Sequence, residues 1–176
     1  MLSKVAVAPF ELGGALLGPE GAVPDPAPAA LVARSVAEAL VARGVPVVAP
    51  EDMRRALGLP ESVAVTLDPE LAAAAAHAKF RADAVLLGVA TRFTEREGEA
   101  YGARRPASVA FQVTLYAAPS GQLLWRAWFN KTQLSLSDNV LETRHYPGGG
   151  TRWLTAEEFA RWGAQQVALE FPFNRP

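Results

Sequence analysis

Two runs of alternating apolar and polar residues, joined by a short turn, constrain this chain more than any other feature. The first run is SVAFQVTLYA (108–117), the second is QLLWRAWFN (122–130), and Pro-Ser-Gly (119–121) lies between them. This turn suits a three-residue hairpin loop in which Gly121 takes the left-handed conformation. The resulting register predicts three cross-strand pairs on one apolar face: Leu115 with Trp125, Val113 with Ala127, and Phe111 with Phe129.

The second face of the same hairpin lacks the polar character that a solvated face normally has. The register places Tyr116 opposite Leu124, Thr114 opposite Arg126, and Gln112 opposite Trp128. Aromatic, aliphatic and arginine side chains together are typical of the centre of a protein interface. Two explanations stay open. Either the C-terminal helix or the segment 130–153 covers this face, or a partner protein or a second copy of the chain does.

The first half of the chain alternates short apolar strands with helices. The predicted strands are 4–10, 45–50 and 82–93. The predicted helices are 30–44, 51–58, 70–80 and, after the hairpin, 156–170. Asp68 and Pro69 form a helix start, and Thr155 with Glu158 forms a capping box. The order strand, helix, strand, helix, helix, strand favours parallel pairing of the first three strands with right-handed crossovers.

The chain has 176 residues, half of them hydrophobic, which is sufficient for one full hydrophobic core. We therefore predict a single α/β domain over 1–176. Its mixed sheet is expected to have about five strands, the first three parallel and the last two an antiparallel hairpin, with helices packed on the sheet.

Three connecting segments are long for a compact domain, and long loops are commonly functional. These expected loops are 11–28, 94–106 and 130–153. We predict a partner-binding surface that combines the second hairpin face with the last two loops. Its predicted residues are Tyr116, Leu124, Arg126 and Trp128 on the face, Tyr101, Arg104 and Arg105 in one loop, and Gln133, Asp138 and Asn139 in the other.

Composition excludes several kinds of function. The net charge of −1, with acids and bases interspersed, gives no electrostatic case for nucleic acid or for anionic lipid. The sequence has no cysteine, and therefore no disulfide, thiolate metal site or cysteine nucleophile. The two histidines, His77 and His145, stand apart from any clustered carboxylates, and no G-x-S-x-G motif is present. We predict no catalytic residue, no metal and no cofactor.

The glycine-rich segment after the first strand supports an alternative function. GGALLG (13–18) joins a strand to a helix, although it lacks the Lys-Ser/Thr of a phosphate-binding loop. Prolines at 24, 26 and 28 also remove amide donors that would contact phosphate. The alternative is a small-molecule or nucleotide-binding enzyme that uses this loop, with a pocket lined by Glu11, Gly13 and Gly14.

Four segments resemble the bacterial envelope lipoproteins of the CsgG, LpoB and TolB N-terminal superfamily. They are KVAVAPFE, GVPVVAPEDMRRALG, KFRADAVLLGVATRFTE and PSGQLLWRAWF. Proteins of that superfamily open with a V-A-V-x-x-F strand and later carry an a-d-a-v-l-x-G-x-V strand, which Ala82-Asp83-Ala84-Val85 through Gly88 and Val89 resemble. Their hairpin turn reads T-G or S-G, as Ser120 and Gly121 do here. KTQLSLSDN and TRWLTAEEFA look like a subgroup of uncharacterised lipoproteins in the superfamily.

The resemblance implies a periplasmic domain, anchored to the outer membrane in the full-length protein, that binds other envelope proteins or itself. Members include a secretion-pore subunit and an activator of peptidoglycan synthases. The chain shows no lipobox cysteine, no secretory signal and no long transmembrane hairpins, so membrane attachment is expected only through a lipid anchor absent from this chain. The expected function is that of a non-catalytic adaptor or scaffold without cofactor. A homo-oligomer with a purely architectural role is a further alternative.

Overall fold

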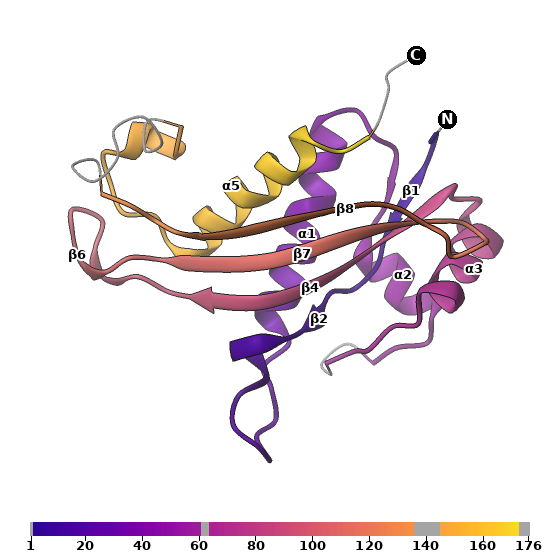
Figure 1. Cartoon of the computed structure of the whole chain (residues 1–176), viewed down its shortest axis with the longest axis horizontal. Helices are drawn as coiled ribbons and strands as arrows, with labels where there is room; N and C mark the ends of the chain where they lie inside the picture. Colours follow the sequence, from indigo (N-terminus) through magenta and orange to yellow (C-terminus); the bar gives the residue numbers. More distant parts are fainter. Residues whose placement is uncertain (1, 61–63, 136–144, 173–176) are drawn as a thin grey trace.

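The computed structural model describes residues 2–60, 64–135 and 145–172, and a six-stranded mixed sheet forms its centre (Figure 1). The strands of this sheet are β1 (Val5–Val7), β2 (Glu11–Leu12), β3 (Val47–Val48), β4 (Ala84–Thr94), β7 (Ser108–Ala117) and β8 (Leu123–Thr132). The helices are α1 (Ala27–Ala42), α2 (Pro50–Ala56), α3 (Pro69–Phe80) and α5 (Ala156–Leu169), with short 3₁₀ turns η1 (Gly14–Leu17) and η2 (Pro147–Gly150).

The sheet joins a parallel half to an antiparallel half, in the order β3-β1-β4-β7-β8. β1 pairs in parallel with β3 and with β4, and β2 continues along β4 beyond the end of β1. β4 then pairs antiparallel with β7, and β7 pairs antiparallel with β8. The predicted single α/β domain, with three parallel strands followed by an antiparallel hairpin, is confirmed.

Two contacts tie β1 to β4 and explain residues of the opening motifs. The Asp83 carboxylate accepts hydrogen bonds from Ser3 N, Ser3 Oγ and Lys4 N at 2.7, 2.7 and 2.9 Å, and the bonds from Ser3 lead in lowering its pKa. The Phe10 ring lies directly over Gly88, where a Cβ atom would come within 2.3 Å of the ring. Gly88 is therefore required for Phe10 to enter the core.

The helices form unequal layers on the two faces of the sheet. α1 and α5 pack on one face, where they bury Val113, Leu115 and Phe129 with the main core. α2 and α3 pack on the other face through Met53 and the alanines of α3, over β1, β3 and the start of β4. Figure 1 shows α2 and α3 gathered at one end of the sheet. Among the residues described, α3 contacts β7 only near Tyr116, and no helix covers the remainder of that face on β7 and β8.

The hairpin register matches the prediction except near the turn. Leu115 pairs with Trp125, Val113 with Ala127, and Phe111 with Phe129, as expected. An irregularity after Leu115 then places Tyr116 opposite Leu123, and not opposite Leu124 as predicted. The turn is accordingly longer than three residues, with Ala117 N donating to Gln122 O at 2.7 Å, and Gly121 has the expected positive φ of 71°.

The segments expected to be loops contain regular structure. The first, 11–28, holds β2, η1 and the start of α1, because prolines are tolerated in the first turn of a helix. The second, 94–106, forms a separate antiparallel pair, β5 (Glu97–Glu99) with β6 (Gly102–Arg105), which extends beyond one end of the main sheet (Figure 1). The third, 130–153, begins inside β8 and includes η2.

Candidate protein-interaction surface

The outward side of β8 is exposed among the residues that the structure describes. Trp128 is 71% exposed, Leu124 is 46% exposed, and Arg126 between them is also exposed. α5, one of the two segments expected to cover this face, packs on the opposite face of the sheet instead. No part of the chain that the structure describes buries Trp128. We call Leu124, Arg126 and Trp128 the β8 face.

A network of polar side chains holds the strands beneath the β8 face in register. Arg92 of β4 donates from Nε to Ser108 Oγ at 2.6 Å and from Nη2 to Asn130 Oδ1 at 2.8 Å. Ser108 Oγ also bonds Thr132 Oγ1 at 2.7 Å. These bonds link β4, β7 and β8 across the same face. The surface around Trp128 is therefore a fixed platform on regular strands, and not a loose loop.

A shallow groove runs beside Trp128, where β8 forms the edge of the sheet. It has a volume of about 330 Å³ and lies between β8 and α5. Its apolar wall includes Phe129 and Trp162, whose rings meet edge to face at 5.6 Å between centroids. Lys131 lies over the Trp162 ring at 5.9 Å. An edge strand offers unpaired backbone groups, so this groove extends the apolar β8 face around a sheet edge.

The predicted partner-binding residues fall into separate groups. Tyr116 is half-buried against the α3 side of the core, while Leu124, Arg126 and Trp128 share β8. Tyr101 is 83% exposed on the turn between β5 and β6. Arg104 is exposed on β6, and Arg105 pairs with Glu97 at 2.8 Å. The structure therefore places these three residues on their own hairpin, apart from the β8 face.

The prediction for Gln133 as a surface residue is wrong. Its side chain is only 2% exposed, because it bridges two backbone groups of another segment. Gln133 Nε2 donates to Arg152 O at 2.9 Å, and Gln133 Oε1 accepts from Leu154 N at 2.7 Å. Gln133 thus secures the approach to α5. Asp138 and Asn139 lie outside the described residues.

An ion pair between Arg152 and Glu158 lies at the N-terminus of α5. Both Glu158 carboxylate oxygens accept from Arg152, at 2.9 and 2.7 Å, and Glu158 also bonds Thr155 N at 2.9 Å. The hydrogen bond from Arg152 leads in lowering the pKa of Glu158 from 4.5 to about 2. The predicted capping box of Thr155 and Glu158 is confirmed. These charges fix the start of α5.

The residues proposed for a nucleotide pocket are engaged in packing. Glu11 Oε1 accepts from Leu67 N at 2.7 Å, which holds an incoming loop against β2. A Cβ atom on Gly13 would come within 2.8 Å of Val89, so this backbone lies directly on β4. Neither observation favours the nucleotide alternative, because an open phosphate site needs free amides and space.

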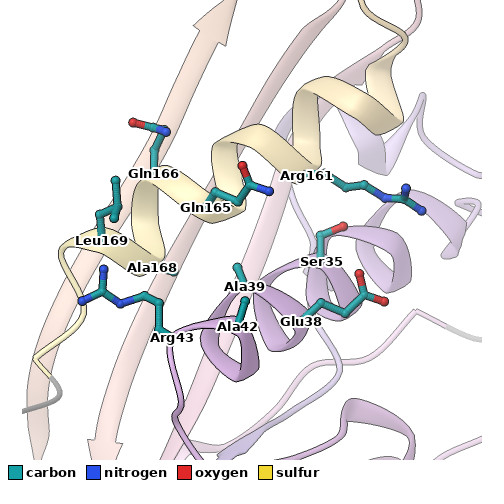
Figure 2. A pocket seen from close by; sticks show the side chains of 10 residues that line it. All are labelled: Ser35, Glu38, Ala39, Ala42, Arg43, Arg161, Gln165, Gln166, Ala168 and Leu169. Carbon is teal, nitrogen blue, oxygen red and sulfur yellow. The ribbon is translucent and has the colours of Figure 1, made fainter. Parts of the chain in front are cut away.

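The groove between α1 and α5 has a volume of about 520 Å³ and a largely small-residue floor (Figure 2). Ala39 and Ala168 lie where the two helices approach, and polar side chains surround them. Ser35 Oγ donates to Leu31 O at 2.9 Å, and Arg161 pairs with Glu157 at 2.6 Å. These contacts give the groove no paired nucleophile and base. Among the described residues, no group of three His, Cys, Asp or Glu side chains is placed to hold a metal.

Within the described ranges, no helix combines the length and the apolar character that crossing a membrane requires. A scan of the sequence against protein-family models gives no match, and a search of curated proteins also gives none.

Comparison with solved structures identifies similar folds. PelC from Paraburkholderia phytofirmans, solved as a dodecamer, is 15% identical, with a TM-score of 0.52 over 94% of this chain and 84% of that chain. A single-substitution variant of PelC, also a dodecamer, gives 17% identity and a TM-score of 0.54, over 94% and 86%.

Two further structures are similar at lower TM-scores. Lipoprotein GNA1162 from Neisseria meningitidis is 19% identical, with a TM-score of 0.48 over 80% of this chain and 88% of that chain. Escherichia coli LpoB is 15% identical, with a TM-score of 0.48 over 76% and 59%. At these identities the likeness concerns the fold. The resemblance that the motifs predict is thus a resemblance of fold.

Proposed function

We propose that this chain is a non-catalytic protein-binding module of a bacterial cell-envelope lipoprotein, and that it works as an adaptor or scaffold through the β8 face. In this proposal the full-length protein is periplasmic and attached to the outer membrane by a lipid anchor. Its partners are other envelope proteins or further copies of itself, and no cofactor takes part.

The observation that carries the proposal is the exposure of Trp128 on a rigid strand. Covering a large exposed indole removes apolar surface from water, so a partner that packs on Trp128 gains binding free energy. Tryptophan and arginine are among the side chains most enriched in residues that dominate binding energy. Trp128 and Arg126 are neighbours on the β8 face, with Leu124 next to them.

The dodecamers of PelC support self-association as one mode of binding. They share the fold of this chain over most of its length. A sheet of this shape, with an edge strand exposed, is thus compatible with repeated contacts between copies. Self-association would cover Trp128 without any second kind of protein.

Site-specific photo-cross-linking tests the proposal in cells that produce the protein. Benzoylphenylalanine at position 128 should give an adduct with another polypeptide chain. The control position is Val23, which is 95% exposed on a loop away from β8. Adducts from position 128 alone support a protein-binding β8 face. If position 128 gives no more adduct than position 23, the β8 face does not contact protein and the proposal fails.

A further inference from the structure

We propose that copies of this chain associate head to tail, with Trp128 of one copy entering a groove beside α1 of the next. This inference rests on the proposed function and identifies the partner of the β8 face as a second copy. It concerns a surface at the opposite edge of the sheet, which the sequence motifs do not single out.

Assemblies larger than a dimer require two different contact surfaces on each copy. A single self-complementary surface joins two copies around a two-fold axis and is then used up. If this chain forms larger assemblies, as proposed by analogy with the PelC dodecamers, the β8 face needs a counterpart elsewhere on the same molecule. A head-to-tail contact between two unlike surfaces is the simplest arrangement that allows further copies to be added.

The described structure offers such a counterpart on α1. Val41 is 57% exposed, whereas Val32, Val36 and Leu40 of the same helix are buried. It opens into a groove of about 440 Å³ between α1, β3 and α2. We call this the α1 groove. Its apolar lining consists of Ala37, Val41, Ala42, Val47, Ala49 and Pro50.

The shapes and positions of the two surfaces are complementary. Trp128 projects from an exposed strand, whereas the α1 groove is concave and has room for one aromatic side chain. β8 and β3 form opposite edges of the sheet, so the two surfaces face away from each other within one copy. One copy can therefore use both surfaces at the same time, with a different neighbour at each.

The charges of the two surfaces are also complementary. Arg126 lies beside Trp128, and neither β7 nor β8 contains an acidic residue. The rim of the α1 groove carries Glu38 and Glu51 against one cation, Arg34. Among the described residues, Arg126, Glu38 and Glu51 form no ion pair within the copy. A head-to-tail contact would bring the Arg126 guanidinium to these two carboxylates, while two β8 faces set against each other would oppose like charges.

Mixing two variants tests the inference, because each variant loses a different surface. Trp128→Lys removes the projecting indole, and Val41→Lys places a cation in the α1 groove opposite Arg126. Val23→Lys is the control, since it makes the same substitution at an exposed valine outside both surfaces. Circular dichroism first establishes that all variants fold. Light scattering during size-exclusion chromatography then measures the mass of each protein alone and of the equimolar mixture.

Head-to-tail association predicts a specific pattern of masses. The unaltered chain and Val23→Lys form assemblies larger than a dimer. Trp128→Lys and Val41→Lys are each monomeric alone, with association weakened at least tenfold. Their mixture forms a dimer that grows no further, because the intact groove of one accepts Trp128 of the other.

Other outcomes overturn the inference. Dimers of Val41→Lys alone would show that β8 faces pair with each other. A monomeric mixture, or an unaltered chain that stays monomeric, would show that the α1 groove does not receive Trp128. If benzoylphenylalanine at 128 then captures a different protein, the proposed function stands without this inference. If it captures nothing, both fail.

Discussion

Trp128 and Phe129 are consecutive residues of β8 with opposite surroundings: the first is 71% exposed and the second is 4% exposed. Phe129 stacks with Phe111 and meets Phe159 and Trp162 edge to face, so it belongs to the core beneath α5. Trp128 points to the other side of the sheet, where α2 and α3 do not reach. One strand thus serves the core with one side and offers a binding surface with the other.

The close packing of α5 on β8 predicts that Gly163→Ala destabilises the fold. An added Cβ would come within 2.7 Å of the Phe129 ring, so helix and strand would have to separate. We expect the free energy of unfolding to fall by about 1–3 kcal/mol, as in other overpacked cores. Urea denaturation measures the change.

Gly102→Ala is the matched control for that substitution. A Cβ atom at Gly102 meets no atom within 4 Å, and its φ is not in the left-handed region. The unfolding free energy of this variant should stay within about 0.5 kcal/mol of the unaltered chain. Equal effects at the two glycines would contradict the packing of α5 described here.

Gln133 bridges two backbone groups in the interior, so its substitution should lower the stability of the fold and leave association unchanged. Gln133→Leu removes the acceptor for Leu154 N and the donor to Arg152 O. An unpaired buried backbone group costs about 1–3 kcal/mol, so thermal unfolding should occur at a lower temperature. The exposed Gln165 provides the control, because Gln165→Leu removes no buried bond. If Gln133→Leu kept normal stability but associated more weakly, Gln133 would belong to the binding surface, and the structural role described for it would be wrong.

The lowered pKa of Glu158 predicts a pH-dependent contribution to stability. Its folded-state pKa is about 2, below the ordinary 4.5, because Arg152 and Thr155 bond the charged form. A carboxylate whose pKa is lowered in the folded state contributes its full stabilisation at pH values above its unfolded-state pKa. This stabilisation is lost as the pH falls through the folded-state pKa. At pH 7, Glu158→Gln should therefore lower the unfolding free energy by about 1 kcal/mol, since the pair is partly exposed.

Comparing urea melts of the two proteins across pH checks this sign. The difference between the unaltered chain and Glu158→Gln should be largest above pH 4.5 and should shrink as pH falls toward 2. A difference that stays constant over this range would mean that the charge of Glu158 does not stabilise α5.

The sequence predicted the sheet and the main hairpin pairs because these depend on local alternation. Val113, Leu115 and Phe129 repeat with the period of a strand, and only one register buries all of them. The irregularity after Leu115 escaped prediction because it depends on the backbone of the turn, which alternation does not encode. Tyr116 is consequently one position away from its expected partner.

The candidate site was predictable only where a residue's strand position decided its exposure. Trp128 and Arg126 alternate with core residues, so the pattern placed them on the second face. Whether a helix covered that face depended on long-range packing, which no local pattern contains. Gln133 lies in a polar stretch of sequence that is typical of a surface segment. It is nevertheless buried, because it bonds two backbone groups of a segment distant in the sequence. The β5–β6 pair is short and contains no large apolar side chain, and it therefore lacks an apolar strand signal.

Sedimentation equilibrium of Trp128→Ala beside the unaltered chain tests the central claim most directly. Because Trp128 lies outside the core, the variant should unfold at nearly the same urea concentration. Its self-association should weaken at least tenfold, as expected when an interface loses a central tryptophan worth on the order of 2 kcal/mol. If the unaltered chain self-associates and the variant does so equally well, or if the variant no longer folds, the result would contradict a β8 face through which copies bind and which is not needed for the fold.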